Sequence, residues 1–448
     1  MNNSILVTLL GLGLLAFSCS DELDVQPAQS IDEGVALSSD ETVKAVLIGA
    51  YDQVSDGDLY GGNALRDADL LGGTGEILFV GTFNSPDEIA RKQITTGNAD
   101  AEARWVESYE GINIVNNVLS ALEVVNADDQ ARVEGEARFI RGLLYFDLVR
   151  YYAQAFESGQ TNDQLGVPIV LTPTRGISAE NDVTRATVEE VYAQVLSDLT
   201  TAADLLPETN GVFAGSLTAS ALLARVYLQM DRYADAREAA DRVIESGVYA
   251  LTPTYVGAFM NGSNTTEDIF AIQVNSQDGV NNLTTFYSVP EFGGRDGDIE
   301  VLDNHLALYE DEDARRDLFF ERGGATYTGK FNNQFANVSI IRLAEMYLIR
   351  AEANSRLGTE VGATPTEDIN RLRNRAGLDD LGDDDVDLAF ILEERRRELA
   401  FEGFRIHDIK RLQGSVGNFA YDANELVFPI PARETVANPN IVQNPGYN

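Results

Sequence analysis

The sequence of 448 residues contains one cysteine, two histidines and one tryptophan. The single cysteine, Cys19, excludes a disulfide within the chain and any zinc site built from several cysteines. Lysine and arginine are also scarce, 33 against 72 aspartate and glutamate residues, so the net charge is −39. A charge of this sign repels phosphate backbones, and we expect no nucleic-acid partner. With 44% hydrophobic residues, the chain can nevertheless form a packed core.

The position of the lone cysteine is informative. Residues 5–17 form an uncharged apolar run that is too short to cross a bilayer of about 30 Å but typical of a signal-peptide core. Cys19 follows this run, and the polar sequence SDELD follows Cys19. We therefore predict that residues 1–18 are a lipoprotein signal peptide and that Cys19 is the acylated first residue of the mature chain. The alternative is an ordinary secretory signal cut near Ser18, with Cys19 left as a free thiol.

Hydrophobic periodicity predicts a mostly α protein. The stripe of Val133, Ala137, Ile140 and Leu144 follows three- and four-residue steps, as on one face of a helix. Later segments repeat a small residue followed by tyrosine three positions on, which resembles a degenerate tetratricopeptide repeat. The predicted helices cover 39–55, 102–125, 128–153, 187–206, 217–228, 233–243, 340–358 and 388–403.

Two long segments lack this periodicity. Residues 56–100 and 247–337 are rich in Gly and Asn, and we expect loops there, with a short strand in the sequence DIFAIQV (268–274). Loops of this length within a compact protein are usually functional. After Gly403 we expect extended chain, and residues 428–448 contain too much Pro and Asn for a helix. This tail is predicted to lie against the body as an extended strap.

The sequence offers little for catalysis. His305 and His407 are the only histidines, and both are expected to be structural; Trp105 is expected in the core. GxSxG, HExxH and paired-cysteine motifs do not occur. With 72 acidic residues, a pair of carboxylates at the separation found in glycosidases carries no information. We therefore predict no enzyme activity and no cofactor.

Two further motifs have simple explanations. Gly324 to Lys330 fits the pattern GxxxxGK, but Phe331 stands where a phosphate-binding loop needs Ser or Thr. The acidic run from Asp379 to Asp387 could collect calcium, yet it lacks the EF-hand spacing. Acidic residues before a helix also complement its dipole, so we predict no metal site there.

Seven segments of the sequence form a recognisable set that extends over nearly the whole chain. They are CSDELDVQP (19–27), RWVESYEGINIVNNVL (104–119), GEARFIRGLLYFDLVRYYA (135–153), IRLAEMYLIRAEANSRLG (341–358), INRLRNRAGL (369–378), EERRRELAFEGFRIHDIKR (393–411), and FPIPARE through NPNIVQNPGY (428–447). In this order, the segments resemble the SusD/RagB family of nutrient-binding outer-membrane lipoproteins.

The resemblance implies a SusD-like fold, in which tetratricopeptide-like helix pairs form a scaffold for long irregular loops that carry the ligand face. It implies an N-terminal region over 19–246 and a C-terminal RagB/SusD region over 247–448 in one composite body. Family members are anchored to the outer membrane by lipid alone, face the exterior, and pass a nutrient to a SusC-like, TonB-dependent barrel. The expected ligand is an oligosaccharide; a peptide or another nutrient stays open, and a surface glycoside hydrolase is the remaining alternative.

Sugar binding needs aromatic faces and nearby polar groups, which points to the two irregular segments. None of the loop aromatics is a tryptophan, which keeps a non-sugar ligand open. The predicted aromatic contacts are Tyr60, Phe79, Phe83, Phe286, Tyr287 and Phe292, and the predicted polar contacts are Asn63, Arg66, Asp67, Asn84, Asn282 and Arg295.

Overall fold

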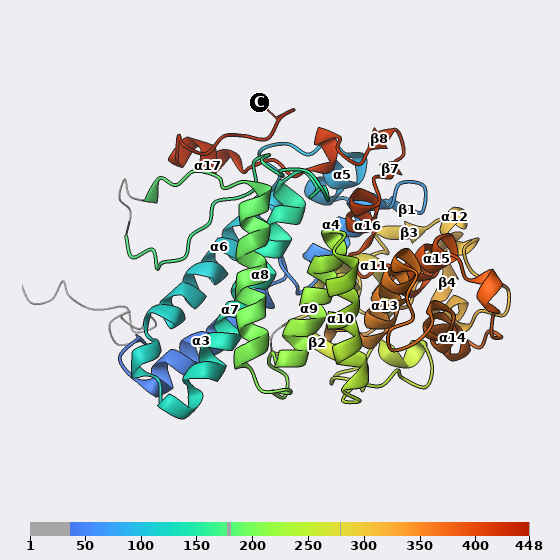
Figure 1. Ribbon diagram of the computed structural model, residues 1–448. Helices are drawn as coiled ribbons and strands as arrows, with labels where there is room; N and C mark the ends of the chain where they lie inside the picture. Colours follow the sequence, from blue (N-terminus) through green and yellow to red (C-terminus); the bar gives the residue numbers. More distant parts are fainter. Residues whose placement is uncertain (1–35, 177–180, 278, 448) are drawn as a thin grey trace, which may run out of the picture.

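The computed structural model describes residues 36–176, 181–277 and 279–447. Cys19 and the predicted signal peptide lie outside the described residues. Within them the fold is mostly helical, as predicted, and the helices stand side by side across the molecule (Figure 1).

The long N-terminal helices occupy the predicted positions to within a few residues. Ser39 caps the first helix, since its hydroxyl accepts a hydrogen bond from the Thr42 N–H, and Thr187 caps α8 through the Glu190 N–H. Their apolar stripes pack against one another in a continuous core that includes Trp105. These helices are α3 (Asp40–Val54), α6 (Ala99–Ser120), α7 (Ala127–Tyr152) and α8 (Val188–Leu205).

The predicted helix pairs are also present. Helix α10 packs against both α9 and α13. Ala224, Ala240 and Ala344 are fully buried in these helices, and small side chains let helix axes approach closely. The predicted helices of these pairs are α9 (Ser216–Gln229), α10 (Tyr233–Glu245) and α13 (Leu343–Leu357), and α14 (Pro365–Arg375), which was not predicted, packs against α13.

The first irregular segment contains helices that the sequence did not reveal. Every residue of α4 (Asn63–Gly72) is buried, including Arg66, Asp67 and Asp69. These charged residues are paired inside the protein instead of facing solvent, and the glycines on either side of the helix give the segment the composition of a loop. The prediction of a loop throughout 56–100 was therefore wrong for α4 and for α5 (Asn84–Arg91).

A small antiparallel sheet joins the two irregular segments. Its strand order is β1-β3-β5-β4, and Ile77 on β1 pairs with Val301 on β3. The predicted strand is confirmed as β2, which pairs with β6. The strands are β1 (Ile77–Phe79), β2 (Asp268–Ile272), β3 (Ile299–Val301), β4 (Phe319–Arg322), β5 (Ala325–Thr328) and β6 (Val338–Arg342). The short helices α11 (Asn282–Tyr287) and α12 (Asp303–Leu306) lie between them in the sequence.

The C-terminal region differs from the prediction in two places. Helix α15 (Leu388–Glu398) ends before Gly403, and the chain resumes as α16 (Arg405–Arg411) instead of continuing extended. The tail crosses the top of the molecule in Figure 1 and includes one short helix, α17 (Ala432–Ala437). It is fixed to the end of α7, because the Phe428 N–H donates to Tyr151 O at 2.7 Å. Strands β7 (Ser415–Val416) and β8 (Phe419–Ala420) form a hairpin before it.

Charged side chains are unusually frequent in the interior of the C-terminal half. Glu398, completely buried at the end of α15, pairs with Arg342 at 3.1 Å and with Arg375. Glu267 also contacts both arginines. Although burial opposes ionisation, the charges of Arg375, Arg342 and Arg315 lower the pKa of Glu398 to about 2. This network ties α13, α14 and α15 to the strand β2 region.

Candidate functional site

The two irregular segments, far apart in the sequence, meet in the fold. The Asn282 N–H donates to Gly61 O at 2.9 Å. Gly62 has a φ of +149°, and a Cβ at this position would lie 2.7 Å from the Leu283 nitrogen. A side chain at Gly62 would therefore push α4 and α11 apart.

Four predicted residues form a continuous stack across this junction. The guanidinium carbon of Arg66 lies 4.1 Å from the centre of the Phe286 ring, and the Phe286 and Phe83 ring centres are 5.9 Å apart. The guanidinium carbon of Arg295 lies 4.1 Å from the centre of the Phe83 ring. Such cation–π and tilted aromatic contacts are favourable and fix the orientation of the rings.

The stack runs from the interior to the surface. Arg66 is 1% exposed and Phe286 7%, whereas Phe83 is 48% exposed and the Arg295 side chain 31%. The exposed end therefore offers the outer part of one aromatic ring and one guanidinium to a ligand. Asn84, the first residue of α5, is exposed directly beside Phe83 in the sequence.

Buried ion pairs hold the inner end of the stack. Arg66 Nη2 lies 2.6 Å from Asp67 Oδ1 and 2.5 Å from Asp100 Oδ2. Asp67 also accepts from Arg104 Nη2 at 2.7 Å. Burial and the like charge of Asp67 raise the pKa of Asp100 to about 6. Asp67 lies inside the protein, so in this structure it orients Arg66 and has no access to a ligand.

Several other predicted residues are internal. Tyr60, Phe79 and Tyr287 are buried, and Tyr287 donates its hydroxyl hydrogen to Asp69 Oδ2 at 3.0 Å. Asn63 is buried and donates to Asp58 Oδ1 at 2.6 Å, and the partly exposed Asn282 lies 3.4 Å from its amide oxygen. These side chains therefore lie inside the protein or at its edge, away from full exposure.

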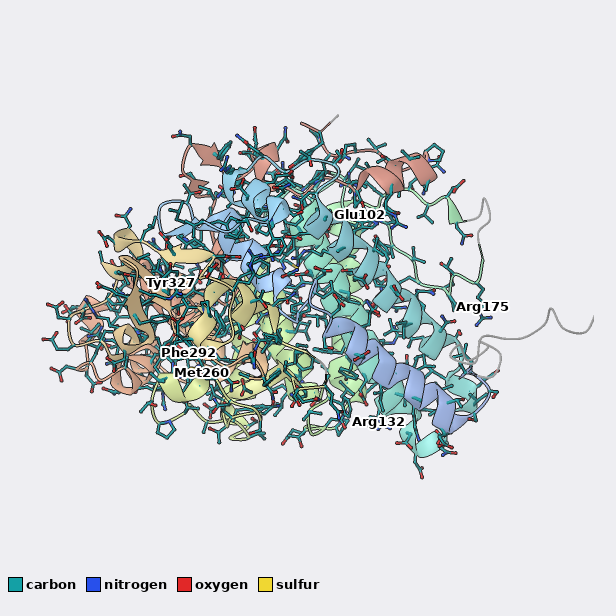
Figure 2. The ribbon with its side chains drawn as sticks, turned by 180° about the vertical axis from the view of Figure 1, so that it is seen from behind. Glu102, Arg132, Arg175, Met260, Phe292 and Tyr327 are labelled. Atoms are coloured by element: carbon teal, nitrogen blue, oxygen red, sulfur yellow. The ribbon has the colours of Figure 1, made fainter. Side chains whose placement is uncertain are left out.

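Phe292 is the exposed member of a second aromatic group. It is 44% exposed, and its ring centre lies 5.9 Å from that of Phe320 on β4. Phe320 in turn lies 5.9 Å from Tyr327 on β5. Figure 2 labels Phe292 and Tyr327 on the β-sheet side of the molecule. Phe320 and Tyr327 were missed from the sequence, although the glycine pair Gly323-Gly324 between two aromatic runs is typical of a hairpin.

Two polar residues next to Phe83 were also missed. Thr82 accepts from Arg295 Nη2 at 2.9 Å, and Asp298 Oδ2 lies 3.5 Å from Arg295 Nε. Burial raises the pKa of Asp298. Asp298 Oδ2 has no hydrogen-bond partner among the described residues. Asp298 is 3% exposed and holds Arg295 from inside, so the guanidinium and Thr82 are the polar groups at the surface beside the ring, which suits hydroxyl groups.

The motifs with possible catalytic or metal chemistry lie outside the Phe83 stack, and their side chains are buried or make contacts that stabilise the fold. Lys330 of the GxxxxGK pattern is buried and donates to Ala400 O and Glu402, each at 2.7 Å. His305 and His407 are both buried. Asp387, at the end of the acidic run, caps α15 through the Phe390 N–H. Across residues 36–176, 181–277 and 279–447, no three His, Cys, Asp or Glu residues form a group able to hold a metal ion.

The described helices include none with the length and apolar character needed to span a membrane.

Residues 21–228 match a family described as "Starch-binding associating with outer membrane", and residues 319–426 match the SusD family.

Individual relatives cover nearly the whole chain. SusD-like protein P2 of Formosa agariphila is 25% identical over 98% of this chain and 99% of its own. A solved SusD superfamily structure from Bacteroides thetaiotaomicron matches with a TM-score of 0.82 and 25% identity, over 91% of this chain and all of that one. A solved laminarin-binding SusD-like protein shares the fold, with a TM-score of 0.76 and 22% identity over 91% of this chain and all of that one. The sequence matches and the shared fold together show that this chain belongs to the SusD/RagB family.

Proposed function

We propose that this protein binds a glycan at the surface of the outer membrane through a capture face formed by Phe83, Asn84, Phe292 and Arg295. The observation that carries the proposal is the exposed Phe83 ring, held in place from below by Phe286 and covered on one side by Arg295. The exposed part of this rigid ring can contact the apolar side of a sugar ring without a large loss of side-chain entropy.

The polar groups of the face suit hydroxyl-rich ligands. Asn84 and Thr82 supply uncharged donors and acceptors, and Arg295 is partly neutralised by Asp298. The net charge of the chain, −39, opposes the approach of a polyanion. The face therefore favours a neutral glycan. Laminarin, which a SusD-like protein of the same fold binds, is one example.

The remaining parts of the proposal rest on family membership and on the sequence. The matched description associates the family with the outer membrane, and Cys19 provides a position for a lipid anchor facing the exterior. The bound glycan would pass unchanged to a SusC-like, TonB-dependent barrel. No catalytic step is proposed, since the polar side chains beside Phe83 include no nucleophile paired with a base.

Affinity electrophoresis of residues 19–448 tests this function directly. Native gels containing laminarin, soluble starch or alginate would be compared, with calorimetry for a peptide panel. We expect retardation by at least one neutral glycan and a tenfold or greater loss of affinity in Phe83→Ala. Val436→Ala is the matched control, because Val436 is 84% exposed on α17, outside both irregular segments.

Two results would overturn the proposal. Absence of binding to every glycan would remove the ligand class, and unchanged affinity in Phe83→Ala would remove the face. Recovery of shortened sugars after incubation would instead show an enzyme. Delivery is tested separately, by co-purification of a barrel protein with the tagged chain from its native membrane.

A further inference from the structure

A second hollow lies apart from the capture face, between α4, α15 and α16. It has a volume of about 240 Å³. Apolar side chains from all parts of this junction form one part of its wall, beside charged ones: Ile77, Leu392, Leu399, Phe401, Phe404 and Leu412. A cavity lined in this way takes an apolar group, provided that its polar parts can also be satisfied.

Two arginines converge on one carboxylate at the wall of this hollow. Arg396 Nη2 and Arg405 Nη2 each lie 2.7 Å from Glu76 Oε1. His305 Nδ1 lies 3.1 Å from Glu76 Oε2. Burial lowers the pKa of His305, so the imidazole is neutral at pH 7. Two guanidiniums thus share one negative charge, and both remain about one third exposed, 29% and 30%.

A third arginine in the lining has unused donor capacity. Arg395 is 3% exposed and pairs with Asp408 through Nε at 2.9 Å. Its Nη1 is buried and has no hydrogen-bond partner among the described residues. Buried polar groups are rarely left unpaired in folded proteins, and an unpaired guanidinium nitrogen at a cavity is suited to an acceptor on a ligand.

The acidic groups of the lining already have partners. Asp408 pairs with Arg395 and Arg411, and Glu393 pairs with Arg397. Asp69 accepts from the Tyr287 hydroxyl, and burial raises its pKa to about 7. The carboxylates of the lining are thus all engaged, and its four arginines, Arg395, Arg396, Arg405 and Arg411, supply the hydrogen-bond donors of the hollow.

We propose that this hollow binds a small carboxylate with an apolar body. The carboxylate takes hydrogen bonds from the Nη1 groups of Arg396 and Arg405, because the Nε and Nη2 of each already bind Glu76. The apolar body lies against Phe401, Phe404 and Leu412. The volume exceeds the roughly 150 Å³ of an engineered apolar cavity that binds benzene, so a single ring fits. None of the capture-face residues lines the hollow, so this site is separate from glycan capture.

Calorimetric titration of residues 19–448 with phenylacetate, and with phenylacetamide as the uncharged match, tests the site. We expect phenylacetate to bind at least tenfold more tightly than the amide and to weaken as salt is raised. Arg396→Gln is expected to weaken phenylacetate at least fivefold, since it removes one of the two guanidiniums. Arg316→Gln is the matched control, because Arg316 is exposed and pairs with Asp311 outside the hollow.

Leu412→Trp gives a second test that leaves every charge in place. Leu412 is partly exposed at the hollow, and a larger ring there should fill it and abolish phenylacetate binding while laminarin retardation is retained. Three results would each overturn the proposal. They are equal affinity for the acid and the amide, unchanged affinity in both Arg396→Gln and Leu412→Trp, and no binding at 20 mM, which is roughly the weakest affinity that such a small ligand would show. Phe83→Ala should leave phenylacetate binding unchanged, which separates this site from the capture face.

Discussion

Arg295 and Phe83 come from opposite halves of the chain, yet the guanidinium carbon lies 4.1 Å from the ring centre. Two further residues fix the positions of this ring and this guanidinium. Phe286 supports the ring from below at 5.9 Å, and Thr82 accepts a hydrogen bond from the guanidinium at 2.9 Å. The contact therefore joins both irregular segments at the exposed surface of the protein.

Arg295→Ala should weaken glycan binding by about two- to fivefold, because an exposed cation–π contact is worth roughly 0.5–1 kcal/mol. Affinity electrophoresis on the best glycan would measure the change. Arg295→Lys should recover part of the affinity, since the charge returns without the planar group. An increase in affinity on removal of Arg295 would contradict the arrangement and would mean that the guanidinium blocks the ring.

Glu398→Gln should destabilise the protein by about 3–5 kcal/mol, because it leaves buried guanidiniums without their shared carboxylate. Arg342 and Arg375 both contact this carboxylate in the interior. Urea unfolding would measure the loss. Glu238→Gln serves as the control, since Glu238 is exposed on α10 and its nearest cation is 3.7 Å away; its effect should stay within about 0.5 kcal/mol.

The protein should lose stability as the pH falls from about 5 toward 2. The pKa of Glu398 is about 2 in the folded chain against an ordinary value of 4.5, so unfolded molecules bind the proton first and are favoured by acid. The contribution of this residue is about 3 kcal/mol above pH 5 and vanishes below pH 2. Urea unfolding at several pH values should show a shallower acid slope in Glu398→Gln than in the parent chain.

Asp69 should act in the opposite direction. Burial raises its pKa to about 7, against hydrogen bonds from Tyr287 and the Gly403 N–H. The folded state therefore holds this proton more tightly, and its stability falls as the pH rises from about 4 to 7. Asp69→Asn should remove that dependence. Relative to the parent chain, the free energy of unfolding of this variant should be most favourable above pH 7, where the parent has lost up to about 4 kcal/mol. A parallel shift at pH 5 and pH 8 would show that Asp69 does not titrate in this range.

Cys19→Ala should release the protein from the membrane fraction, because the lipid is the proposed anchor. Immunoblots of membrane and soluble fractions from cells expressing the full chain would measure this. Ser20→Ala is the neighbouring control and should remain attached. Persistent attachment of Cys19→Ala would mean that another segment or partner holds the protein at the membrane.

The sequence by itself was sufficient to predict the helical scaffold. Helices such as α7 and α9 carry apolar stripes at three- and four-residue steps, and this period depends only on the local geometry of a helix. Family membership could likewise be predicted, since the matching segments lie along the whole chain. The two glycine-rich segments were correctly identified as places where the chain departs from that scaffold.

The tertiary structure alone decided what those segments form. In helix α4 the charged Arg66, Asp67 and Asp69 are buried and are paired with the distant Asp100, Arg104 and Tyr287. Such pairing leaves no trace in the local sequence. For the same reason the sequence could not distinguish Phe83, exposed at the surface, from Tyr287, which is buried behind it. Both are aromatic residues in irregular segments, and their exposure depends on contacts between residues about two hundred positions apart, which only the folded chain brings together.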